Sequence, residues 1–315
     1  MAVNIKELTK VPERLGPGHR LCAGCGAPIV AKMVMMGTTD PVVVTNATGC
    51  LEVATTIYPY TAWKTSWMHN AFENSAATIA GVESAYRSLK KQGKVKKDIK
   101  FLAFGGDGGT YDIGLQALSG ALERGHNFVY VCYNNEAYMN TGIQRSGATP
   151  KGAATTTSPA GEVIPGKRVF PKDLTQIVAA HNIPYAAQGS ISNWKDLVEK
   201  AQKAFSAEGP AFLNVFSPCP PGLKHATDKS VEMAKLMVEC KAWPLYEIEN
   251  GKYRITYTPR KVRPVSEWVA MQGRFRHLQK QENKHIIEEM QKRVDEQWAR
   301  LENLQEATAD KETSS

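Results

Sequence analysis

A glycine turn and an asparagine pair stand at the ends of two neighbouring apolar runs. The turn "GDG" at 106–108 closes the run "IKFLAFGG", and "NN" at 134–135 closes the next run. Glycines let backbone amides approach a diphosphate closely. The Asp107 carboxylate, the Asn135 amide oxygen and the Ala137 carbonyl are ligands that suit Mg²⁺. Each motif alone is typical of an ordinary turn, but two parallel strands would bring both to one sheet edge, which favours a magnesium–diphosphate site.

Four of the six cysteines follow elements that would carry them to the same edge. Cys22 and Cys25 form a CxxC in "HRLCAGCGAP", Cys50 follows the first expected strand, and Cys219 follows the last. Four thiolates suit zinc or an iron–sulfur cluster. A CxxC alone is also found in structural zinc sites and redox disulfides. The positions of these four cysteines therefore predict a metal site, and the choice of metal depends on the neighbouring chemistry.

The spacing of "GDG" and "NN", with 25 residues between them, resembles the thiamine diphosphate (ThDP) motif. ThDP chemistry on a 2-oxoacid releases CO₂ and leaves an electron pair that an oxidative reaction must pass to an acceptor. Zinc cannot accept electrons here, whereas a [4Fe-4S] cluster can, so the neighbouring ThDP site favours iron–sulfur. Cys132 lies inside an apolar run and Cys240 has no partner nearby, so both are expected to be structural.

The chain resembles the β subunit of the pyruvate:ferredoxin oxidoreductase family, whose relatives act on other 2-oxoacids and on oxalate. Five motifs between residues 19 and 222 carry the resemblance: "HRLCAGCGAP", "NATGCLE", "GGDGGTYDIG", "YNNEAYMNTGIQRSGATP" and "SPCPPG". The segment "WPLYEI…YRITYTPRKVRPVSEWV" also resembles the tail of that subunit. Some relatives have an acidic residue just after the CxxC, where this sequence has Ala27, so no carboxylate contact is predicted there.

The resemblance implies three sets of site residues. The [4Fe-4S] ligands would be Cys22, Cys25, Cys50 and Cys219. The Mg²⁺ ligands would be Asp107, Asn135 and the Ala137 carbonyl. The positions around ThDP would be Gly49, Cys50, Gly106, Asp107, Gly108, Asn135, Ala137, Asn140 and Thr141. Among them Asn140, in "YMNTG", matches a side chain that reaches the substrate and the reactive carbon, so it is the predicted catalytic residue.

The implied function is one subunit of an anaerobic 2-oxoacid:ferredoxin oxidoreductase complex. Pyruvate and coenzyme A (CoA) would give acetyl-CoA and CO₂, with electrons passing through the cluster to ferredoxin. Oxalate, which would give two CO₂ without CoA, and other 2-oxoacids stay open. The sequence shows no second α/β pattern, so an α subunit would supply the pyrimidine side of ThDP and its glutamate. No CxxCxxCxxxCP run is present, so a γ or ferredoxin-like δ subunit would carry further clusters.

Alternating strand and helix patterns must position these residues. Strands are expected at 41–46, 99–106, 127–135, 183–190 and 210–218, and helices at 74–91, 112–125, 171–182 and 193–209. This alternation predicts an α/β fold with a mainly parallel sheet covered by helices on both faces. By the resemblance it is the ThDP-binding fold of the PP type, with a helical C-terminal extension. The aperiodic segment 138–171 is long enough to predict a functional loop.

Three regions are expected along the chain. Residues 1–220 would form the ThDP and [4Fe-4S] domain, 221–305 an extension that contacts partner subunits, and 306–315 a disordered tail. The charged segment 274–305 has one apolar helical stripe. We expect this stripe to lie on a partner subunit, the alternative being a solvated extension. The stripe comprises Ile286, Ile287, Met290, Val294, Trp298 and Leu301.

Composition limits the remaining possibilities. Of 315 residues, 42% are hydrophobic and 22% charged, as in a globular protein. The apolar runs are too short to cross a membrane, and the first residues lack a signal-peptide core, so a cytoplasmic protein without membrane contact is expected. The net charge of +8 fits acidic partner proteins better than nucleic acid, because no DNA- or RNA-binding module accompanies it.

Two alternatives from other classes remain. The first is a non-redox ThDP lyase or synthase with a structural zinc on the cysteines. The second is a basic nucleic-acid-binding zinc protein, which would leave "GDG" and "NN" unexplained.

Overall fold

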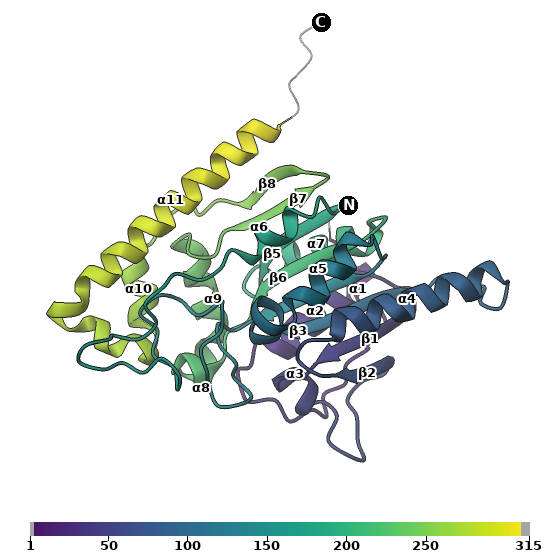
Figure 1. Cartoon of the computed structure of the whole chain (residues 1–315), viewed down its shortest axis with the longest axis horizontal. Coiled ribbons are helices and arrows are strands. Elements are labelled where there is room, and N and C mark those ends of the chain that lie inside the picture. The colour runs from purple at the N-terminus through teal and green to yellow at the C-terminus, as the bar shows by residue number, and fades with distance from the viewer. Residues whose placement is uncertain (1–2, 310–315) are drawn as a thin grey trace, which may run out of the picture.

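Eight strands form one sheet in the computed structural model, which describes residues 3–309 (Figure 1). Their order is β2-β1-β3-β4-β6-β5-β7-β8, and all neighbours from β2 to β5 are parallel. The strands are β1 (Val42–Ala47), β2 (Ser66–Asn70), β3 (Lys100–Gly106), β4 (Val129–Asn134), β5 (Tyr185–Ser190), β6 (Ala211–Phe216), β7 (Leu245–Glu249) and β8 (Lys252–Tyr257). The parallel part brings the carboxyl ends of β1, β3, β4 and β6 to one edge.

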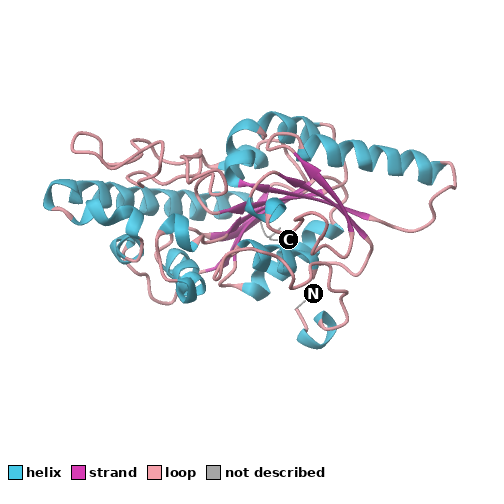
Figure 2. Cartoon of the chain, turned by 90° about the horizontal axis from the view of Figure 1, so that it is seen from below, coloured by secondary structure: helices cyan, strands magenta, loops and turns pink. Residues whose placement is uncertain are grey.

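The mainly parallel α/β fold is confirmed, with helices on both faces of the sheet (Figure 2). Strand residues alternate between the two cores: Leu102 and Phe104 of β3 face one, Phe101 and Ala103 the other. The first core packs against α2 (Ala27–Met35), α7 (Trp194–Ser206) and α9 (Ser230–Glu239), and the second against α4 (Ser75–Lys91), α5 (Leu115–Glu123) and α6 (Leu174–Ala179). Near-continuous burial of the central strands explains their apolar sequences.

The helix expected at 112–125 begins earlier and in another form. A π-helical turn, Gly108–Ile113, follows Asp107 directly, and α5 begins only after it. Its last bond joins the Gly114 amide to the Gly109 carbonyl at 2.6 Å. Such turns are rare in proteins, and those that occur often lie at functional sites. Here the turn sets the path of the chain next to the predicted diphosphate site.

The extension after residue 220 is not only helical, which corrects the expectation. Strands β7 and β8 form an antiparallel hairpin that joins the sheet beside β5. Asn250 and Gly251 connect them, with φ of 49° and 80°. Asn-Gly between alternating hydrophobic residues is a strong hairpin signal, so this sequence pattern was available and was missed. Strand β2 was also not predicted.

The last helix packs on its own chain. Figure 1 shows α11 (Lys284–Thr308) beside β8. Five of its six stripe residues are buried and Ile287 is partly buried, so the expectation that this stripe lies on a partner subunit is wrong. Gln305 and Thr308 accept hydrogen bonds from backbone amides of β8, which covers the sheet edge. Contact of the extension with partners through other faces stays a prediction.

The remaining elements are short. They are α1 (Ile5–Leu8), α3 (Cys50–Val53), α8 (Pro220–Leu223), α10 (Val265–Ala270) and the 3₁₀ turns Thr227–Lys229, Gly273–Gln279 and Gln281–Asn283. Of the predicted tail, residues 306–308 belong to α11, and 310–315 lie outside the described residues. None of the helices within 3–309 combines the length and apolarity that a bilayer span needs.

Candidate cofactor and metal site

One cavity lies at the carboxyl ends of β1, β3 and β4, and we call it the diphosphate cavity. Every residue that the resemblance places around ThDP lines it: Gly49, Cys50, Gly106, Asp107, Gly108, Asn135, Ala137, Asn140 and Thr141. This chain encloses only about 20 Å³ there, whereas ligand pockets usually enclose about 300 Å³ or more. This chain alone therefore does not enclose a cavity of the size that a cofactor needs.

The Asp107 carboxylate is completely buried beside this cavity. It accepts hydrogen bonds from Ser146 Oγ at 2.5 Å and from the backbone N–H of Asn135 at 3.2 Å. Burial raises the pKa of Asp107 to about 7, although these two donors act in the opposite direction. A buried carboxylate with so few donors is a group that a bound cation would keep ionised.

Three polar groups converge where a cation would be needed. The Asn135 carboxamide lies 2.9 Å from both the Ala137 carbonyl oxygen and Asp107 Oδ1. With its NH₂ group toward them, the amide donates to both oxygens. With its oxygen toward them, three oxygens face one point without a proton between them, which is the environment that Mg²⁺ prefers. The residues present therefore fit the predicted magnesium ligands.

The backbone at Glu136 orients this group. Glu136 has φ of 67°, an uncommon conformation for a residue other than glycine. Its neighbours Asn135 and Ala137 both face the diphosphate cavity, while Glu136 itself lines another cavity. A buried ion pair with Arg274 and a 2.6 Å hydrogen bond from Thr149 Oγ1 to the Glu136 carbonyl hold it in place. These contacts stabilise the strained backbone at Glu136.

The loop that carries the CxxC motif docks against the segment that carries Cys219. The Gly26 amide donates to the Pro218 carbonyl at 3.1 Å. Gly24 has φ of +75°, and a Cβ there would lie 2.1 Å from the Thr227 carbonyl oxygen. A side chain at Gly24 would therefore push the two segments apart. The docking brings residues nearly 200 positions apart in the sequence into contact.

The four predicted cluster thiols interact electrostatically as one group. Burial raises the pKa of Cys25 to about 11 and that of Cys50 and Cys219 to about 12. The charge of Cys22 raises the pKa of all three further, as do the charges of Cys25, Cys50 and Cys219 on one another. Asp107 also acts on Cys50, so Cys50 links this quartet to the diphosphate cavity. Cys22 is exposed, Cys25 and Cys50 are partly buried and Cys219 is buried. A cationic centre would be needed to keep these neighbouring thiols ionised together.

Within residues 3–309, no group of three His, Cys, Asp or Glu side chains is arranged to hold a single metal ion. The two remaining cysteines lie apart from the predicted quartet. Cys132 and Cys240 are fully buried and line none of these sites; Cys240 Sγ donates to the Met237 carbonyl.

Sequence reasoning missed two polar residues at this cavity. Ser146 binds Asp107 from the long loop, and nothing local in the sequence indicates that contact. Tyr133 lines the cavity, is 2% exposed, and its hydroxyl has no hydrogen-bond partner among the described residues. A Cβ on Gly49 would lie 2.4 Å from that hydroxyl. Gly49 is therefore needed to leave room for Tyr133.

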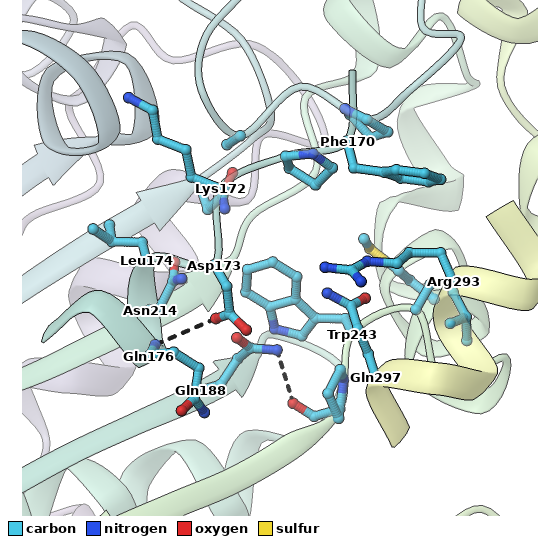
Figure 3. Close-up of a pocket in the computed structure, with 18 of the residues that line it drawn as sticks. Phe170, Lys172, Asp173, Leu174, Gln176, Gln188, Asn214, Trp243, Arg293 and Gln297 are labelled. Atoms are coloured by element: carbon cyan, nitrogen blue, oxygen red, sulfur yellow. Dashed lines mark hydrogen bonds between the residues drawn. The ribbon is translucent and has the colours of Figure 1, made fainter. Parts of the chain in front are cut away.

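A larger cavity of about 170 Å³ lies under α11, and we call it the α11 cavity (Figure 3). Asp173 and Arg293 reach toward Trp243 from opposite sides (Figure 3). Gln188 donates to the Pro244 carbonyl at 3.0 Å, and Asn214 donates to the Tyr111 hydroxyl at 2.8 Å. None of the predicted cofactor residues lines this cavity. The larger cavity is thus separate from the predicted chemistry.

Comparison with known proteins gives consistent results. Residues 47–215 match the family model described as "Thiamine pyrophosphate enzyme, C-terminal TPP binding domain". The chain is 54% identical to pyruvate synthase subunit PorB of Thermotoga maritima, over 99% of each chain. It is 54% identical to PorB of Methanocaldococcus jannaschii, over 90% of this chain and 95% of the relative. It is 43% identical to ketoisovalerate oxidoreductase subunit VorB of Pyrococcus furiosus, over 96% and 97%.

One solved structure shares the fold. It is the 2-oxoglutarate:ferredoxin oxidoreductase from Magnetococcus marinus with 2-oxoglutarate, coenzyme A and succinyl-CoA bound. The TM-score is 0.55 at 20% identity, over 70% of this chain and 79% of that chain. At this identity the similarity concerns the fold alone.

Proposed function

This chain belongs to the family of pyruvate synthase PorB subunits, and we propose that it is the cofactor-binding subunit of a pyruvate:ferredoxin oxidoreductase complex. In this role it holds the diphosphate end of ThDP through Mg²⁺ and carries one [4Fe-4S] cluster. The proposal rests on one residue that belongs to both the diphosphate cavity and the predicted cluster site. Cys50 lines the diphosphate cavity and also belongs to the thiol quartet.

The oxygen groups of the cavity have defined tasks in this proposal. Asp107, Asn135 and the Ala137 carbonyl hold Mg²⁺, while the glycines at 106 and 108 leave room for the diphosphate. When bound, ThDP supplies the covalent chemistry of 2-oxoacid decarboxylation. Asn140, which lines the cavity and is exposed in this chain, orients the substrate. The small volume of the cavity supports an α subunit as the opposite wall.

The thiol quartet supports the oxidative reaction over the non-redox alternative. Cys22, Cys25, Cys50 and Cys219 would hold the cluster, which would supply an electron acceptor next to the cavity. A structural zinc ion, which the lyase and the nucleic-acid-binding alternatives require, could not accept electrons there. Ferredoxin, reached through a γ or δ subunit, receives the electrons.

The proposed overall reaction is pyruvate + CoA + 2 oxidised ferredoxin → acetyl-CoA + CO₂ + 2 reduced ferredoxin + H⁺. Similarity to the PorB proteins supports pyruvate as the substrate. The similarity to VorB keeps a branched 2-oxoacid as the second candidate. Oxalate has no support in these comparisons.

The test is anaerobic purification of the complete complex, followed by analysis of metal content and turnover. We expect iron and thiamine to copurify, and an absorption band near about 400 nm to bleach on reduction. Ferredoxin reduction should require both pyruvate and CoA. A colourless zinc protein, or turnover of pyruvate without ferredoxin reduction, would contradict the proposal. Faster turnover with 2-oxoisovalerate would reassign the substrate.

A further inference from the structure

The α11 cavity, which the predicted chemistry does not use, has charged groups of both signs on its wall. Asp173 caps the N-terminus of α6, and Arg293 and Arg300 belong to α11. Within residues 3–309, no ion pair joins Asp173 to either arginine. Asp173 and Arg293 lie on opposite sides of Trp243 (Figure 3). Opposite charges that line one cavity without meeting leave room between them for a ligand that carries both charges.

The acidic side of the cavity offers two oxygen acceptors. The Asp173 carboxylate accepts one hydrogen bond from the described chain, from the backbone N–H of Gln176 at 3.3 Å. The surrounding protein removes water from this carboxylate and raises its pKa, although the side chain is exposed to solvent through the cavity. Asn214 lies on the same side of Trp243 (Figure 3), is 1% exposed, and its Oδ1 has no partner among the described residues. A cationic N–H donor would satisfy both acceptors.

The basic side offers a guanidinium group for an anion. Arg293 Nε is buried without a hydrogen-bond partner within residues 3–309. The only ion pair of Arg293 in that part of the chain is with Glu296 at 4.0 Å, between half-exposed side chains, and such pairs are weak. The Phe170 ring lies 5.8 Å from its guanidinium carbon and helps to hold the group at the cavity. A guanidinium placed in this way can bind a carboxylate through two parallel hydrogen bonds.

An apolar wall lies between the two charged sides. Trp243 is 7% exposed, and its Nε1 donates to the Gly189 carbonyl at 2.7 Å, which fixes the ring. The buried apolar side chains that line the cavity with it are Leu174, Met237, Met290, Val294 and Leu301. This wall suits an apolar group of a ligand better than a third charge.

The volume of the cavity limits the size of the ligand. It is about 170 Å³. An apolar cavity of about 150 Å³ holds benzene, so this one accommodates roughly six to ten non-hydrogen atoms. The exposed side chains of Lys172 and Asp173 on one rim and of Glu296 and Arg300 on the other mark its opening to solvent. A ligand of this size must combine an ammonium group, a carboxylate and an apolar part in very few atoms.

We propose that the α11 cavity binds a free α-amino acid with an aliphatic side chain. Its ammonium group donates to Asp173 and Asn214, its carboxylate accepts from Arg293, and its side chain packs on Trp243. Charge-assisted hydrogen bonds at both ends give the site its preference for a zwitterion. The inference does not rest on the function proposed above, because none of the predicted cofactor residues lines this cavity.

The first test is calorimetric titration of the complete complex with L-valine, L-leucine and L-isoleucine. We expect at least one of them to bind with a Kd of about 1 mM or tighter. Two analogues of leucine each lack one charge: 4-methylpentanoate has no ammonium group, and 3-methylbutylamine has no carboxylate. Each should bind at least about tenfold more weakly, as expected for loss of a charge-assisted hydrogen bond. Binding of none of the three amino acids, or equal binding of leucine and 4-methylpentanoate, would overturn the proposal.

The second test assigns each charge of the ligand to one side chain. Asp173→Asn should weaken leucine binding about tenfold and leave 4-methylpentanoate binding unchanged, because only the ammonium group loses its partner. Arg293→Gln should weaken both of these ligands about tenfold and leave 3-methylbutylamine binding unchanged. In each variant the unaffected ligand shows that the cavity is still folded. Ligand-observed NMR measures the weaker analogues.

The matched controls are Asp295→Asn and Lys292→Gln, two exposed residues of α11 that lie outside the cavity. Neither control should change the affinity for leucine or for its analogues. Unchanged leucine binding in both Asp173→Asn and Arg293→Gln would overturn the assignment, because the amino acid would then bind elsewhere in the complex.

Discussion

Residues Asn134 to Ala137 separate two cavities that differ in how their polar groups are satisfied. Asn134 and Glu136 face the α11 cavity, and Asn135 and Ala137 face the diphosphate cavity. On the first side, Asn134 donates to the Tyr111 hydroxyl at 2.9 Å and Glu136 pairs with Arg274. On the second side, three oxygen-bearing groups converge on one point.

The difference lies in the kind of group that faces each cavity. Under α11, Asn134 and Glu136 are paired within the chain, and the atoms without a partner among the described residues are Asn214 Oδ1, Trp268 Nε1 and Arg293 Nε. At the diphosphate cavity, the groups that converge are oxygen ligands of the kind that a hard cation prefers. Asp107, with its raised pKa, and the unpartnered Tyr133 hydroxyl lie on the side of the smaller cavity.

The largest effect is expected at Cys50. This thiol lines the diphosphate cavity, whereas no cysteine of the described chain lines the α11 cavity. Cys50→Ser should abolish ferredoxin reduction and alter or remove the iron–sulfur EPR signal, because one of four ligands is lost. Cys240→Ser is the control, since that thiol is buried elsewhere, and it should keep both. Wild-type activity in Cys50→Ser would remove this residue from the ligand set.

The next test compares alanine substitutions of two neighbouring asparagines, one facing each cavity. Asn135→Ala should weaken Mg²⁺-dependent ThDP binding at least about a hundredfold, because a metal ligand is lost. Asn134→Ala should leave that affinity nearly unchanged and lower the free energy of unfolding by about 1–3 kcal/mol, since Tyr111 loses a buried partner. Calorimetric titration and thermal unfolding separate the two results. Equal losses of affinity would show that both cavities serve the cofactor.

The protonation of Asp107 predicts a pH dependence at the diphosphate cavity. Its pKa of about 7 in the folded chain exceeds the ordinary 3.8, so the folded state binds the proton more tightly. Stability of the metal-free protein should therefore fall as pH rises from 3.8 to about 7 and then level off. Because Mg²⁺ displaces this proton, its affinity should drop about tenfold for each pH unit below about 7.

The control for this pH dependence is Asp107→Asn, in which the titrating group is absent. Magnesium affinity in that variant should be weak and should not change with pH between 5 and 8, a range spanning roughly two units below the pKa and one above. A pH-independent affinity in the wild-type protein would show that Asp107 is already ionised without a cation.

The smallest effect is expected from removing single hydroxyl groups. Tyr111→Phe takes an acceptor away from two buried amides, Asn134 and Asn214, and should lower the free energy of unfolding by about 1–3 kcal/mol. Tyr133→Phe removes a hydroxyl without a partner and should change it by less than about 0.5 kcal/mol. Chemical denaturation of both variants measures the difference. A large loss in Tyr133→Phe would reveal a hidden partner in the folded chain.

The sequence by itself determined that the side chains predicted to bind magnesium lie close together. Parallel strands end at one edge of a sheet, so two local motifs after neighbouring strands were sufficient to bring Asp107 and Asn135 together. The same rule placed Cys50 and Cys219 at that edge. Alternating apolar and polar runs also predicted the five strands and the helices that cover them, because burial on a sheet face is a local property of the pattern.

Only the tertiary structure decided the contacts that depend on long chain paths. Nothing near Ser146 in the sequence shows that its loop returns to Asp107. The apolar stripe of α11 indicated burial but not the covering surface, which proved to be its own chain. An amphipathic pattern specifies which face is buried, whereas the partner of that face is set by the packing of distant segments.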